Sequence, residues 1–157
     1  MADGQLACLT TLSSDHVAVS ISGFDYSDVL RGSPYGGCAI IWKSSLNYRV
    51  MPIAANSRRV YAVLFESDDV RLLCICVYMP YESDASSITE FQYQLSVIDT
   101  LLQQHPGCHV LVGGNFNVDF SRNWNNTLVL NNFCASADLF PVSHNDCSKV
   151  DYTHHFV

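Results

Sequence analysis

The sequence predicts an α/β (α+β) fold in which a mixed sheet, or a pair of sheets, is covered by helices. β-Rich runs come first along the chain, and two of them flank a short polar segment that predicts a hairpin. A capping motif followed by apolar residues at helical spacing then predicts a helix, after which a strand, a helix and a strand follow. With 157 residues, segment 1–157 is expected to form one domain with a sizeable core.

The first half of the chain predicts four strands. Segment 16–22 (HVAVSIS) alternates apolar and polar residues, as a half-buried strand does, and segment 37–43 (GCAIIWK) is also β-rich. Four glycines and a proline between them, over 23–37, indicate a loop. Segments 58–66 and 70–80 are β-rich on either side of Ser-Asp-Asp, so they predict the hairpin.

A helix is expected to follow this hairpin. Ser87, with Glu90 three residues later, predicts a capping box at its start, and Pro106-Gly107 ends it. One apolar stripe along the helix is expected to pack on a sheet; its members are Phe91, Leu95, Ile98, Leu101 and Leu102.

The last third predicts three more elements. Segment 108–113 is short and almost wholly apolar, which is typical of a central strand covered on both faces. A second helix is expected over 126–137. Segment 148–156 alternates again, so it predicts a final strand that carries Asp151 and His155 on one face.

Charge and cysteine usage limit the functional classes. A net charge of −7 argues against a non-specific nucleic-acid coat, although a divalent metal could bridge carboxylates and phosphates in a nuclease. A positive groove would have to use the SRRV segment or Arg122. The seven cysteines lie mostly in apolar runs without a CxxC pair, as buried thiols do in a reducing compartment, so an intracellular location in the nucleus or cytoplasm is expected. No apolar run is long enough to span a membrane and the first residues do not form a secretory signal, so no membrane partner is expected.

The segment VGGNFNVDF (112–120) is the main candidate for chemistry. A predicted buried strand ends there, and catalytic groups often follow such a strand end. Asn115 and Asn117 would point the same way from extended backbone, where they could hold a water and a phosphate oxygen. A polar turn after a core strand is the alternative interpretation. Tyr78 ends a second strand, and its phenol could bind a phosphate or simply be a tyrosine of the core.

Five segments in order resemble the endonuclease/exonuclease/phosphatase superfamily, and most closely the endonuclease domain of non-LTR retrotransposon endonuclease–reverse transcriptase proteins. They are GGCAIIWK, SRRVYAVLFES, CVYMPY, HVLVGGNFN and KVDYTHHF. The resemblance implies two packed, mostly antiparallel sheets with helices on the outside, here an incomplete four-layer sandwich that lacks the first and last strands of the family. It also implies cleavage of DNA phosphodiesters with Mg²⁺ or Mn²⁺.

The resemblance assigns roles to individual residues. Tyr78 matches the tyrosine that contacts the scissile phosphate, and Asn117 matches the asparagine that orients the phosphate and the attacking water. Asp151 matches the aspartate that orients a catalytic histidine. Arg122 and Tyr81 are the candidate nucleic-acid-binding residues near these loops.

The chain also departs from the family pattern. Asn115 stands where the family has the aspartate that activates water, and an amide cannot accept the proton. No Gln-Glu pair supplies the metal-binding glutamate, and the chain stops at HHFV where the family continues to a Ser-Asp-His strand. His155 shares the face of Asp151 and is the weak candidate for a substitute. No residue is therefore assigned as a metal ligand.

Three functional interpretations result. The first is a retroelement-derived endonuclease fold whose activity is absent or strongly reduced. The second is a non-catalytic module that binds nucleic acid or pairs its unpaired strand edges with a partner, including a second copy of itself. The third is a fragment of a decaying element.

Overall fold

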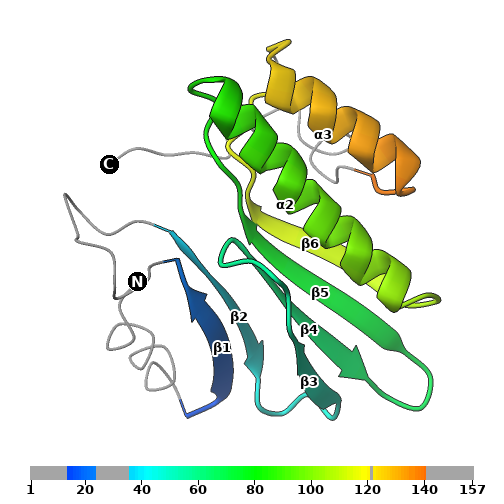
Figure 1. Cartoon of the computed structure of the whole chain (residues 1–157). Coiled ribbons are helices and arrows are strands. Elements are labelled where there is room, and N and C mark those ends of the chain that lie inside the picture. Colours follow the sequence, from blue (N-terminus) through cyan, green and yellow to red (C-terminus); the bar gives the residue numbers. More distant parts are fainter. Residues whose placement is uncertain (1–13, 24–35, 121, 141–157) are drawn as a thin grey trace.

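The computed structural model describes residues 14–23, 36–120 and 122–140 (Figure 1). The elements in chain order are β1 (His16–Ser22), β2 (Gly37–Lys43), β3 (Arg49–Ile53), β4 (Val60–Glu66), β5 (Arg71–Tyr78), α2 (Ala85–Gln104), β6 (His109–Asn115) and α3 (Asn125–Ser136). The predicted final strand over 148–156, with Asp151 and His155, lies outside the described residues, as does most of the predicted loop over 23–37.

The described strands form two sheets. β1 pairs with β2 in one sheet, and the other sheet has the order β3-β4-β5-β6. Every described pair is antiparallel except β5 with β6, whose connection runs through α2. The predicted mostly antiparallel pair of sheets and the predicted hairpin between β4 and β5 are therefore confirmed.

Both helices cover one face of the four-stranded sheet (Figure 1). The predicted stripe of α2 forms the core with them, since Phe91, Leu95, Ile98 and Leu101 are all buried. On the sheet side the core consists of Val60, Ala62, Leu73, Ile75 and Val77. The opposite face of the sheet meets β2, where the rings of Trp42 and Phe65 lie 5.4 Å apart edge to face. The described residues thus form a helix layer and two sheet layers of the expected sandwich.

The start of α2 corrects the predicted capping box. Asp84, not Ser87, is the N-cap residue, and its carboxylate accepts the Ser87 N–H at 2.9 Å. Ser87 occupies the third helical position and its Oγ accepts the Asp84 N–H at 3.1 Å. The box therefore begins three residues earlier, because a serine hydroxyl closes it as well as a glutamate does. Glu90 is left to contact Arg59 and Gln94.

β3, which was not predicted, lies at one edge of the four-stranded sheet as far as it is described. Pro52 interrupts this short run, and a proline argues against a strand unless the strand is at an edge. Its partner in the register is Val63 of β4.

The prediction that segment 108–113 is covered on both faces is wrong. Among the described strands, β6 is at an edge of its sheet, and the side chain of Leu111 is 54% exposed. Val110 and Val112 are partly buried, and Val112 packs against the helix-side core. Leu111 instead lines an open groove of about 670 Å³ between the two sheets, together with Ile41 and Leu72. The run is apolar because one of its faces meets helices and the other meets this groove.

Neither α2 nor α3 is both long and apolar enough to cross a membrane, and no other helix of the described residues is.

Candidate functional site

Two parallel strands end side by side, and two of the predicted site residues stand at that end. Tyr78 is the last residue of β5 and is in register with Asn115, the last residue of β6. Residues in register on neighbouring strands have their side chains on the same face. That face is the one toward β1 and β2, since a side chain built on Gly36 would begin 3.5 Å from the Tyr78 ring.

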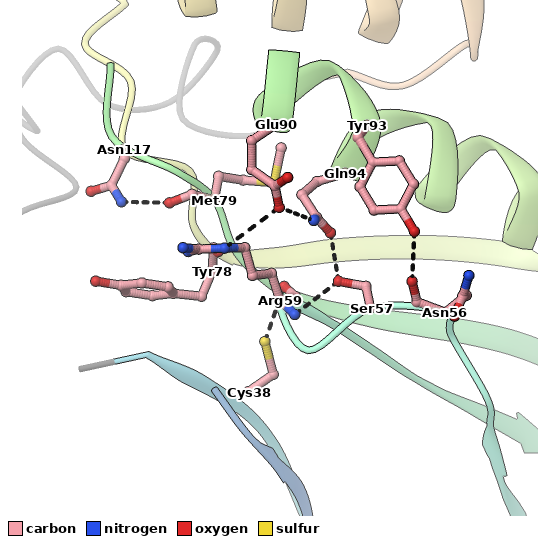
Figure 2. A network of polar contacts seen from close by, with 10 residues as sticks. All are labelled: Cys38, Asn56, Ser57, Arg59, Tyr78, Met79, Glu90, Tyr93, Gln94 and Asn117. Atoms are coloured by element: carbon pink, nitrogen blue, oxygen red, sulfur yellow. Dashed lines mark hydrogen bonds and ion pairs between the residues drawn. The ribbon is translucent and has the colours of Figure 1, made fainter. Parts of the chain in front are cut away.

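Asn115 and Asn117 then shape the turn that leaves β6. Asn115 Oδ1 accepts the Asn117 N–H at 2.9 Å, which closes an Asx-type turn. Asn117 adopts a left-handed conformation (φ +50°), which asparagine tolerates better than most residues. Its Nδ2 donates to the Met79 carbonyl oxygen at 2.7 Å (Figure 2). The two strand ends are therefore tied together, and a second bond between them runs from the Met79 N–H to the Asn115 carbonyl oxygen at 2.8 Å.

Arg59 supplies the positive charge beside Tyr78 (Figure 2). Its guanidinium carbon lies 5.8 Å from the centre of the tyrosine ring, and its Nη1 donates to the Tyr78 carbonyl oxygen at 3.3 Å. Glu90 approaches the Nε of Arg59 to 3.8 Å. From the sequence, the SRRV segment was expected only to line a positive groove, and Arg59 itself had no predicted role. The contact depends on the pairing of β4 with β5, which residue type alone does not reveal.

A chain of polar contacts from Ser57 and from α2 fixes Arg59 (Figure 2). Gln94, which is 2% exposed on α2, donates to Glu90 at 2.6 Å. Ser57 Oγ donates to Gln94 at 2.5 Å and accepts the Arg59 N–H at 2.9 Å. The buried amide of Gln94 therefore connects α2 to the segment that holds Arg59, so the guanidinium is held in place before any ligand arrives.

The predicted nucleic-acid-binding residues lie on the loops that follow these two strands. Tyr81 follows β5 and is 58% exposed, and its ring meets Trp124 edge to face at 6.1 Å. Arg122 lies over Trp124 at 5.1 Å, with its Nε 3.1 Å from Asp119 Oδ2. The structure thus groups Tyr81 with Arg122, whereas Tyr78, Asn115 and Asn117 form the strand-end group. Asp151 lies outside the described residues.

The described residues do not fit Mg²⁺ or Mn²⁺ at the strand end. Hard divalent cations take carboxylate oxygens, and Tyr78, Asn115 and Asn117 carry none. The three carboxylates on the neighbouring loops have other partners. Glu82 accepts the Asn126 N–H at 2.9 Å, Asp84 caps α2, and Asp119 pairs with Arg122. Nowhere in 14–23, 36–120 and 122–140 do three His, Cys, Asp or Glu side chains gather to hold a metal ion.

Behind the strand end lies a pair of thiols from different sheets. The five described cysteines are free thiols. A hydrogen bond from Cys38 of β2 lowers the pKa of Cys76 of β5 to about 7. The same bond, together with burial, raises the pKa of Cys38. Cys76 also lines the groove between the sheets, so a small reagent can reach it.

Cys76 is therefore expected to be the first of the described thiols to react with iodoacetamide near pH 7, since the thiolate is the nucleophile. Burial raises the pKa values of Cys74 and Cys134, so these thiols should react only at higher pH. Mass spectrometry of digests made after timed alkylation at pH 6–9 measures each rate. Cys38→Ala should slow Cys76 at pH 7, whereas Cys74→Ala should not; equal rates in the two variants would contradict the paired-thiol explanation.

Several solved structures have a fold similar to that of the described residues. The endonuclease domain of TRAS1, a telomere-specific non-LTR retrotransposon, superposes with a TM-score of 0.59 at 8% identity over 80% of this chain and 54% of that one. Beta toxin from Staphylococcus aureus gives a TM-score of 0.56 at 14% identity over 84% and 54% of the two chains. An endonuclease/exonuclease/phosphatase family protein from Bacteroides thetaiotaomicron gives 0.53 at 14% identity over 85% and 50%.

These likenesses confirm the resemblance at the level of the fold, which is that of the endonuclease/exonuclease/phosphatase proteins. This chain spans about half the length of these solved structures. No protein-family model matches the sequence, and no curated protein matches it. Residue roles therefore have to be argued from the site itself.

Proposed function

We propose that the chain is a retrotransposon-endonuclease type of phosphodiesterase fold that holds a DNA phosphate at the ends of β5 and β6 but hydrolyses it slowly or not at all. The observation that carries the proposal is the strand-end group itself. Tyr78 and Asn115 lie in register, and Asn117 is tied across to Met79, in a fold whose solved examples include nucleases.

The group has the donors that a phosphate needs. The phenol of Tyr78 can donate one hydrogen bond. The bond to Met79 uses one of the two amide hydrogens of Asn117, which leaves the second for a ligand. Arg59 brings a guanidinium close to the same tyrosine, and hydrogen bonds from charged donors to phosphate are about twice as strong as neutral ones.

The group lacks the base that hydrolysis needs. Asn115 Oδ1 is already the acceptor of the turn, and a neutral amide cannot take a proton from water. Removing a general base typically costs about 10²–10⁴-fold in rate. Binding without efficient cleavage is the function that this set of side chains supports.

Two measurements on the same protein test the proposal. Incubation of supercoiled plasmid with Mg²⁺ or Mn²⁺ is expected to give no nicking above that of buffer, and mobility-shift assays at low salt are expected to show DNA binding that weakens as salt rises. Low salt is needed because the chain carries a net charge of −7. Robust nicking that disappears in Asn117→Ala would overturn the loss of activity, and absence of any shift would overturn the phosphate site.

A strand-pairing module is the second candidate, which the edge position of β6 among the described strands favours. This strand has no partner on its outer side among the described strands, and its own Leu111 side chain is exposed. An open edge with apolar neighbours can pair with another strand, including one from a second copy. Concentration-dependent dimers in sedimentation experiments, together with no affinity for DNA, would favour this candidate over the first.

The retroelement origin and the compartment belong to the same proposal. A reverse-transcriptase reading frame directly downstream of the gene would support an element that is decaying, and its absence would favour a domesticated gene.

The free thiols of the described part of the chain support a location in a reducing compartment of the cell, the nucleus or the cytoplasm, and imaging of a tagged protein tests this location.

A further inference from the structure

The loops after β5 and β6 carry a group of rings and a guanidinium that the strand-end site does not use. Tyr81 comes from the first loop, and Arg122 and Trp124 come from the second. The ring planes of Tyr81 and Trp124 meet at 86° in an edge-to-face contact, so the indole covers at most one of the two broad faces of the phenol. With 58% of Tyr81 exposed, the phenol ring is open to solvent.

The position of Trp124 is unusual for its residue type. It is the N-cap residue of α3, where Ser, Thr, Asp and Asn are preferred, and its side chain makes no capping hydrogen bond. Glu82 of the first loop caps the helix instead, and accepts the Asn125 N–H at 3.3 Å and the Asn126 N–H at 2.9 Å. The indole therefore does not serve the helix end, and a residue that breaks a local preference points to another use.

The two loops are held together firmly enough to keep these side chains in place. Glu82 bridges them at one end and the bond from Asn117 to Met79 bridges them at the other. Arg122 is braced twice, by the indole at 5.1 Å and by Asp119 at 3.1 Å. A braced side chain loses less conformational entropy when it binds a ligand.

We propose that Tyr81 is a stacking platform for an unpaired nucleotide base, with Trp124 as its brace and Arg122 as the partner of the adjacent phosphate. This inference rests on the proposed function, because the same strand would run to the phosphate site at Tyr78. Tyr81 is only three residues from Tyr78, so their Cα atoms are at most about 11 Å apart. Successive bases of one strand rise about 3.4 Å, so a few nucleotides span that distance.

The ligand class is single-stranded nucleic acid rather than duplex. A base inside a duplex has both faces covered by its neighbours, whereas an unstacked base offers a face to an aromatic ring. Such stacking tolerates any base, so the platform should bind without sequence preference.

Fluorescence anisotropy with two labelled oligomers of equal length tests the inference on the full chain. One is oligo(dT), and the other is an abasic oligomer with the same phosphates but no bases. The wild-type chain is expected to bind oligo(dT) about 5- to 150-fold more tightly, the range for stacking one base. Tyr81→Ala should remove this preference, whereas Tyr81→Phe, which keeps the ring, should retain it.

Tyr93→Ala is the matched control, because Tyr93 is also an exposed tyrosine, 44% accessible, but lies on α2. It should leave the preference unchanged, and a loss equal to that of Tyr81→Ala would overturn the inference. Equal binding of the two oligomers by the wild-type chain would overturn the stacking platform and leave the phosphate site standing. Binding of neither oligomer would overturn both proposals.

Discussion

Gly114→Ala is expected to lower the free energy of unfolding by about 2–6 kcal/mol, a large share of the total stability of a typical domain. Gly114 is in register with Val77 of β5, and a Cβ at this position would overlap the carbonyl oxygen and the nitrogen of Val77. The conformation of Gly114 (φ +133°) is also one that L-residues rarely adopt. Backbone strain of this kind costs about 1–3 kcal/mol, and forced overpacking costs a similar amount. The clash is with backbone, which cannot rotate away as a side chain can.

Gly113→Ala is the matched control for this prediction. A Cβ at Gly113 would have no atom within 4 Å, and the residue has no positive φ. Its stability should change by less than about 1 kcal/mol, as at most exposed sites. Urea titrations followed by circular dichroism give both values. If the two alanine variants were equally stable, the close approach of β6 to β5 at the candidate site would be wrong.

Most of the fold could be predicted from the sequence because its signals are local. Alternation over β1 and the helical spacing of Phe91, Leu95 and Ile98 each report burial of one face, and the structure confirms both elements. The errors occur where burial on a second face matters. β6 is apolar on both faces, which indicated a central strand, yet one of those faces meets an open groove and the outer edge has no strand beside it in the described part of the chain.

The candidate site could be predicted only in part, for a related reason. Tyr78, Asn115 and Asn117 follow strands, and strand ends can be found from apolar runs and glycines. Their mutual placement follows from the parallel register of β5 and β6, which was not predicted from the motifs. Arg59 and Trp124 had no such signal, because each contacts a residue that is distant in the sequence. Arg59 contacts Tyr78, and Trp124 contacts Tyr81. Contacts of single residues with partners far away in the sequence leave no periodic pattern.

The second prediction with a large effect concerns Asn117, whose backbone and side chain have separate tasks. Its left-handed backbone favours glycine or asparagine, and its amide both ties β5 to β6 and, in the proposed function, binds the phosphate. Asn117→Gly keeps the backbone and loses the amide, whereas Asn117→Ala loses the amide and adds strain of about 1–2 kcal/mol. In urea titrations, stability should therefore fall from wild type to glycine to alanine, with a loss of about 1–3 kcal/mol for alanine.

DNA affinity should follow a different order in the same variants, because only the amide touches the ligand. A hydrogen bond to a charged group contributes about 1.5–3 kcal/mol, so both variants should bind oligo(dT) about 10- to 100-fold more weakly than wild type, by similar factors. Anisotropy titrations at low salt measure the affinity, at a temperature where every variant is still folded. If Asn117→Gly bound as tightly as wild type, the amide would be only a tie between strands. If affinity instead fell in the order of stability, unfolding would explain the loss, and Asn117 would have no direct part in holding the phosphate.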